Sequence, residues 1–113
     1  MDGGISIFGL GYVGSVSAAC LANKNIKVIG VDTNQMKVDM LNSGQALIIE
    51  PGLSQLTEDA VSNGHLRATT DALDAVLSSD LTFLCVGTPS QQNNSLDLTY
   101  VKHACEKIGR AHV

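Results

Sequence analysis

Short apolar runs alternate with segments of helical character along most of the chain. Four of these runs have the length of buried strands. They are Ile5–Phe8, Ile26–Val31, Leu66–Thr69 and Leu81–Val86. Most of them lack a polar residue at every second position, so we expect strands that are buried on both faces, as in a parallel sheet.

Five segments are expected to be helices, from small apolar residues or from apolar residues at helical spacing. They are Val13–Ala22, Asn34–Asn42, Leu53–Ser62, Ala72–Leu77 and Leu98–Ile108. Asp71 can cap the fourth of these helices, with Asp74 completing a capping box. Pro51-Gly52 interrupts regular structure and makes residues 45–52 a loop. The alternation of strands and helices predicts an α/β domain with a parallel sheet between helices.

A glycine motif lies between the first strand and the first helix. Residues 9–14 read Gly-Leu-Gly-Tyr-Val-Gly, which is the pattern Gly-x-Gly-x-x-Gly. In a dinucleotide-binding turn, Gly9 permits the tight bend, Gly11 allows a pyrophosphate close to the backbone, and Gly14 lets the helix approach the strand. The amino end of the following helix then offers free N–H groups and a partial positive charge to the phosphates.

A second feature of the same fold is an acidic residue at the end of the second strand, which binds the adenosine ribose. Asp32 occupies that place, eighteen residues after Gly14. A carboxylate there would repel a 2′-phosphate, and no arginine follows immediately, so we expect NAD rather than NADP. The alternative is a loop rich in glycine beside an unrelated aspartate.

Composition narrows the class of protein. The length of 113 residues suits one domain, and an aromatic content of 4% requires an aliphatic core. The net charge of −4 argues against binding to nucleic acid or to anionic membranes. No signal peptide or membrane-spanning run is evident. The three cysteines are widely spaced, so we expect reduced, buried thiols, no metal site, and a cytoplasmic protein.

Four segments together resemble the UDP-glucose/GDP-mannose dehydrogenase family, in the order and at the spacings of that family. They are residues 7–14, Gly30-Val31-Asp32, Glu50-Pro51-Gly52-Leu53 and the Cys-Val-Gly-Thr-Pro-Ser run at 85–90. That last run and Leu96-Asp97-Leu98 are most similar to the GDP-mannose branch, with the UDP-glucose branch as the alternative. Such enzymes oxidise the sugar C6 alcohol to a carboxylate and consume two NAD+. No chemistry is assigned to Glu50-Pro51.

The resemblance also implies roles for individual residues. Tyr12 and Val13 would line the pyrophosphate turn, Lys37 would contact the adenosine portion, and Thr88 would approach the cofactor from the fourth strand. Ligands of doubly wound sheets bind where the strand order reverses, here between the first and fourth strands. The glycine turn and residues 87–90 would therefore face each other.

No catalytic residue is expected in this chain. The resemblance implies that the catalytic cysteine, the general base and the sugar-binding domain lie downstream. The cysteines present are expected on the buried first helix (Cys20), inside the fourth strand (Cys85) and on the last helix (Cys105). None has the electropositive setting of a nucleophilic thiol. The histidines, His65, His103 and His112, are interpreted as surface or packing residues.

The expected fold is a Rossmann-like, doubly wound parallel sheet, truncated after the fourth strand and its following helix, so that residues 1–113 form a partial NAD-binding domain. In the order 3-2-1-4 the apolar fourth strand lies at an edge, so we expect self-association or marginal stability. The leading hypothesis is an enzyme segment that binds NAD without turnover. A stand-alone regulatory module and another dehydrogenase or flavin family are the alternatives.

Overall fold

A single parallel sheet forms the centre of the molecule. The computed structural model describes residues 4–85, and these residues contain four strands in the order β3-β2-β1-β4. The strands are β1 (Ile5–Phe8), β2 (Val28–Val31), β3 (Leu66–Thr69) and β4 (Leu81–Leu84). All three neighbouring pairs are parallel, which confirms both the fold class and the expected strand order. The second strand begins two residues later than expected, at Val28.

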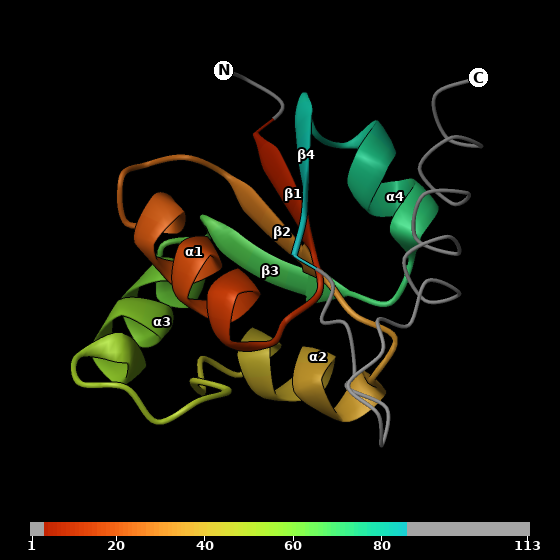
Figure 1. Cartoon of the computed structure of the whole chain (residues 1–113). Coiled ribbons are helices and arrows are strands. Elements are labelled where there is room, and N and C mark those ends of the chain that lie inside the picture. The colour runs from red at the N-terminus through yellow and green to blue at the C-terminus, as the bar shows by residue number, and fades with distance from the viewer. Residues whose placement is uncertain (1–3, 86–113) are drawn as a thin grey trace.

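Four helices connect the strands and cover the sheet on two sides. They are α1 (Tyr12–Ala22), α2 (Gln35–Asn42), α3 (Leu53–Ser62) and α4 (Ala72–Leu77). Figure 1 shows α1 and α3 on one side of the sheet and α4 on the other. The helix expected at 98–108 lies outside the described residues. Among residues 4–85, no helix has the length and apolar character needed to cross a membrane.

The strands bury side chains on both faces. On one face, Ile7, Val28 and Leu66 pack with residues of α1, α2 and α3 in the larger core cluster. On the other face, Phe8 and Ile29 join Ala72, Ala75 and Val76 of α4 in a smaller cluster. All residues of β1 and β2 are buried, as expected for central strands of a parallel sheet.

Side-chain caps begin two of the helices. The Asn34 side chain accepts hydrogen bonds from the N–H groups of Met36 and Lys37 at the start of α2. Asp71 accepts from the Asp74 N–H at 3.1 Å, as expected for α4. The return half of the capping box does not form, because the Asp71 N–H donates to the Thr69 hydroxyl at 3.0 Å. The Asp74 carboxylate pairs with Arg67 at 3.1 Å.

The two edges of the sheet differ in exposure. On β4 the apolar side chains Leu81, Phe83 and Leu84 are 40–44% exposed, so the expectation of a buried strand is wrong. Among residues 4–85, β4 has a neighbouring strand, β1, on one flank only, so its side chains lack the cover that the central strands receive. At the opposite edge, the Asn42 amide bonds both backbone groups of Ala68, donating to its C=O at 3.0 Å and accepting from its N–H at 2.8 Å. The Asn42 side chain therefore occupies the backbone hydrogen-bonding groups of Ala68 to which a further strand could otherwise pair.

Helix α1 lies against the strand that precedes it because residue 14 has no side chain. A Cβ on Gly14 would lie 1.8 Å from the Gly9 carbonyl oxygen and 2.9 Å from its carbon. These are backbone atoms, so relief would require moving the whole strand-to-helix turn. The expected role of Gly14 in close helix–strand packing is therefore confirmed.

Gly14→Ala is expected to lower the free energy of unfolding by about 1–3 kcal/mol, because the added methyl overpacks against backbone. Without that clash, alanine inside a helix would stabilise by about 1 kcal/mol, so the sign of the effect is diagnostic. Gly11→Ala is the matched control, since a Cβ there meets nothing within 4 Å among the described residues beyond its chain neighbours. Urea unfolding followed by circular dichroism measures both, and equal stabilities would contradict the packing role.

Candidate dinucleotide-binding site

The turn from β1 into α1 has the backbone conformation that its glycines were expected to allow. Gly9 has a φ of 99°, in the left-handed region that side chains disfavour. Its N–H donates to the Val31 carbonyl at 2.8 Å, which carries the ladder between β1 and β2 into the turn. The turn therefore begins directly beside the end of β2.

Leu10 fixes the turn through its side chain and its backbone. The side chain is 1% exposed and packs over β2, where a Cβ on Gly30 would lie 2.8 Å from Leu10 Cδ2. The Leu10 N–H donates to Asp32 Oδ2 at 2.9 Å, and its carbonyl accepts from the Ser15 hydroxyl at 3.1 Å. The sequence did not predict these roles of Leu10 and Gly30 or the hydrogen bond of Ser15, although Gly30 belongs to one of the segments that carry the family resemblance.

The amino end of α1, like that of α3, has no side-chain cap, in contrast to α2 and α4. Its N-cap is Gly11, and the first bond into the helix runs from the Ser15 N–H to the Gly11 carbonyl at 3.0 Å. The N–H groups of residues 12–14 come before that bond and have no acceptor within the helix. They carry the positive end of the helix dipole, which is suited to a phosphate.

The space next to these N–H groups is open. Within residues 4–85, no atom beyond the adjacent residues lies within 4 Å of the place where a Gly11 Cβ would stand, so packing in this part of the chain does not require glycine there. The side chains of Tyr12 and Val13 are 57% and 62% exposed. An open approach to free N–H groups fits the diphosphate of a dinucleotide, which must come close to the backbone.

Asp32 follows β2 and points its carboxylate toward the glycine turn. One oxygen accepts from the Leu10 N–H and the other from the Asn34 N–H, both at 2.9 Å. The residue is half-buried. Because both bonds come from backbone, the carboxylate is held beside the turn with lone pairs to spare for further donors.

The remaining expected cofactor residues lie on α2 and beyond β4. Lys37 is a partly exposed residue in the first turn of α2, directly after the Asn34 cap. Thr88 lies outside the described residues. The end of β4 does reach the glycine turn, because a Cβ on Gly14 would lie 3.5 Å from the Cys85 Cβ.

Tyr12 makes one contact that sequence reasoning missed. Its phenol donates to Glu50 Oε2 at 3.0 Å, across 38 residues of chain. This hydrogen bond, together with the negative charge of Glu50, raises the pKa of Tyr12 above its ordinary value of 10.0. Glu50 belongs to a segment that carries the family resemblance, but no sequence pattern pairs it with Tyr12.

The described cysteines differ from expectation. Cys20 is on α1 but is exposed, so its expected burial is wrong. Cys85 follows β4, which ends at Leu84, although its N–H still bonds the Phe8 carbonyl at 2.7 Å. His65 is half-buried before β3. Cys105, His103 and His112 lie outside the described residues.

A hollow of about 300 Å³ lies at the other end of the sheet. Lys27, His65 and Arg67 are among its lining residues, near the amino ends of β2 and β3. The glycine turn and Asp32 are at the carboxyl ends of the strands, where ligands of doubly wound sheets bind. The hollow is therefore not part of the candidate site.

A doubly wound parallel sheet, an uncapped glycine-rich helix start and a carboxylate after β2 define a dinucleotide-binding domain. The NAD binding domain of the UDP-glucose/GDP-mannose dehydrogenase family matches residues 3–113, and the chain belongs to that family. This match also confirms NAD as the expected cofactor.

Relatives agree with this assignment. The chain is 50% identical over 107 residues to the GDP-mannose 6-dehydrogenase of Azotobacter vinelandii, covering 95% of this chain and 24% of the relative. It is 41% identical over 105 residues to a UDP-glucose 6-dehydrogenase of Bacillus subtilis, covering 93% and 23%. A crystal structure of a ternary complex of GDP-mannose dehydrogenase from Pseudomonas aeruginosa superposes with a TM-score of 0.92 at 50% identity, covering 98% and 25%. The chain thus spans about a quarter of the length of these relatives.

Because Glu50 raises the Tyr12 pKa, the hydrogen bond contributes fully below pH 10.0 and is lost as the pH rises through the higher folded-state value. Phenolate absorbance in a Tyr100→Phe background isolates Tyr12, since the chain has 2 tyrosines. Glu50→Ala is expected to return the titration to that of an ordinary tyrosine. Glu58→Ala removes another exposed carboxylate as the control, and identical curves for both variants would contradict the contact.

Proposed function

We propose that this chain binds NAD as the dinucleotide-binding part of a nucleotide-sugar 6-dehydrogenase. The observation that carries the proposal is the uncapped start of α1 beside the carboxylate of Asp32, which Leu10 ties to the glycine turn at 2.9 Å. Diphosphate and ribose are neighbours in NAD, and this turn offers adjacent groups that suit each of them.

The proposed contacts divide by the chemistry of the cofactor. The backbone of the glycine turn holds the diphosphate. The Asp32 carboxylate accepts hydrogen bonds from the ribose hydroxyls, and Lys37 contacts the adenosine portion. Thr88 approaches from the segment after β4. The complete set of proposed cofactor residues is Gly9, Gly11, Tyr12, Val13, Gly14, Asp32, Lys37 and Thr88. The charge of Asp32 excludes a 2′-phosphate, which favours NAD over NADP.

For the whole protein we propose oxidation of GDP-mannose to GDP-mannuronate, with two NAD+ reduced per sugar. The sequence at 85–90 and the 50% identity to GDP-mannose 6-dehydrogenases support this substrate over UDP-glucose, where identity is 41%. The UDP-glucose reaction is the alternative, and a stand-alone NAD-binding regulatory module is the second. Residues 1–113 are proposed as a partial domain, with the catalytic and sugar-binding parts outside them and no turnover by this chain alone.

The proposed setting is the cytoplasm. Free thiols at Cys20 and Cys85 are in keeping with a reducing compartment. The net charge of −4 supports the absence of nucleic acid and membrane partners.

Asp32→Ala is expected to weaken NADH binding on the order of ten- to a hundredfold, because hydrogen bonds to a charged group are lost. NADH fluorescence titration measures the affinity. Asp39→Ala is the matched control, since Asp39 is an exposed carboxylate on α2 whose side chain accepts a hydrogen bond from the Gln35 amide at 2.8 Å. An Asp32→Ala variant that binds NADH as tightly as the unaltered chain would refute the ribose role.

We further propose that the chain self-associates through the edge of β4. The exposed side chains Leu81, Phe83 and Leu84 flank backbone that has no strand on its outer side among residues 4–85. Unpaired apolar edges favour pairing with another chain. The β3 edge is less suited to pairing with another chain, because the Asn42 side chain already bonds the backbone of Ala68 there.

Size-exclusion chromatography over a dilution series is expected to show an elution volume that depends on concentration. Phe83→Lys should shift the chain toward monomer, since a charge on an edge strand opposes pairing. Leu73→Lys, at an exposed position of α4, is the control and should leave association unchanged. A monomer at every concentration would rule the proposal out.

A further inference from the structure

The Tyr12–Glu50 hydrogen bond joins the glycine turn to the loop before α3, and the proposed cofactor contacts leave Glu50 unexplained. The Glu50 backbone is held in position by a hydrogen bond. Its carbonyl accepts from the Leu53 N–H at 3.0 Å across a turn in which Gly52 has a φ of 80°. Asn23, at the end of α1, links α1 to α3 by donating to the Leu56 carbonyl at 2.9 Å. The backbone of Glu50 thus has a defined position relative to α1, from which its side chain reaches Tyr12.

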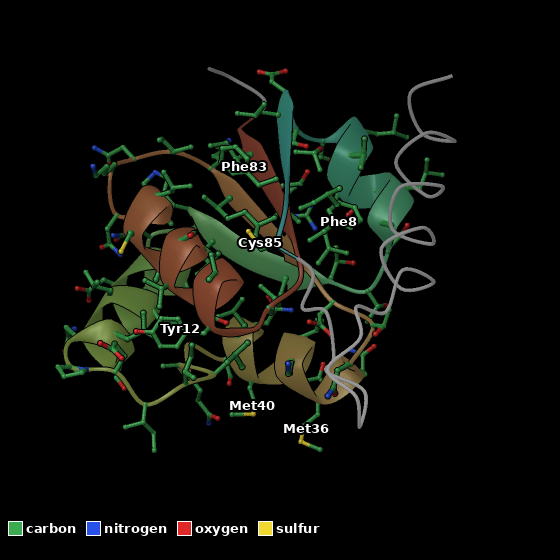
Figure 2. The ribbon with its side chains drawn as sticks, viewed as in Figure 1. Phe8, Tyr12, Met36, Met40, Phe83 and Cys85 are labelled. Carbon is green, nitrogen blue, oxygen red and sulfur yellow. The ribbon has the colours of Figure 1, made fainter. Side chains whose placement is uncertain are left out.

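The position of Tyr12 in its helix means that the hydrogen bond to Glu50 decides where the tyrosine ring lies. Tyr12 is the first residue of α1, and helix side chains lean toward the amino end. An unrestrained ring at this position would lean over the free N–H groups of residues 12–14. In the structure the ring lies instead toward the loop that leads into α3 (Figure 2), where the phenol meets Glu50.

We propose that Glu50 is a positioning residue for dinucleotide binding, which holds the Tyr12 ring to the side so that the amino end of α1 stays open to a diphosphate. Glu50 does not touch the cofactor. It acts through the 3.0 Å bond to the phenol and through the turn at Gly52. This inference rests on the proposed NAD-binding function.

NADH fluorescence titration of a small set of variants tests the inference. Tyr12→Phe and Glu50→Ala are each expected to weaken binding about three- to tenfold, the range that one hydrogen bond supplies. Their combination should be no weaker than either alone, because both remove the same bond. Glu50→Gln should retain most of the affinity, since its amide oxygen still accepts the phenol. Glu58→Ala is the control for loss of an exposed carboxylate.

Removing the ring separates positioning from a purely structural role. Adding Tyr12→Ala to Glu50→Ala is expected to recover most of the lost affinity, because no ring remains to cover the N–H groups. A structural role for the bond predicts the reverse, with the double variant as weak as Glu50→Ala or weaker. Circular dichroism and urea unfolding of each variant show that folded chains are compared.

Each outcome bears on one of the two proposals. If the unaltered chain binds NADH and Asp32→Ala binds weakly, while Glu50→Ala binds as the unaltered chain does, the positioning role is wrong and the function stands. Additive losses from Tyr12→Phe and Glu50→Ala would also overturn it. If the unaltered chain does not bind NADH at all, the function fails, and the positioning role fails with it.

Discussion

The hydrogen bond from the Leu10 N–H to the Asp32 carboxylate is the contact on which the proposed site depends. It joins two segments 22 residues apart, at 2.9 Å, where β1 and β2 end. Without it the glycine turn and the carboxylate would be two separate features of neighbouring strands. The buried Leu10 side chain gives the bond a rigid base, because a residue that is 1% exposed in a packed core has little freedom to shift.

The site is defined by polar groups that the fold leaves unsatisfied. Asn34 and Asp71 cap α2 and α4 with their own side chains, so those helix starts are complete. Helix α1 begins at Gly11, which has no side chain with which to cap it. The absence of a side chain at Gly14 lets that residue pack against Gly9, and the absence of one at Gly11 leaves the approach to its backbone open. One glycine-rich turn therefore gives both close packing on the inside and an accessible helix dipole on the outside.

Features set by local chemistry could be predicted from the sequence. Helix α3 and strand β3 have the expected bounds, and the Asp71 cap and the conformation of Gly9 follow from residue type. Exposure was harder to predict. Helix α1 has small or apolar residues on every side, so periodicity could not show that Cys20 faces outward. An apolar strand such as β4 has the same pattern at an edge as at the centre of a sheet.

The polar contacts that shape the site could not be predicted, because they join distant segments. Nothing in the local sequence pairs Tyr12 with Glu50, or an asparagine of α2 with the backbone of β3. Asp32 was expected to face a ribose, and its bond to Leu10 emerged only when β1 and β2 were placed side by side. Motif reasoning thus located the groups, and tertiary structure supplied their orientation.

Leu10 and Gly30 occupy what is in effect a single volume. A methyl group on residue 30 would lie 2.8 Å from one Leu10 methyl and 3.3 Å from the other. The two positions are twenty apart in sequence, yet the size of one limits the size of the other. A side chain at position 30 would therefore require the Leu10 side chain to move aside or to be replaced by a smaller one, so the residue at position 10 limits the size of the residue at position 30.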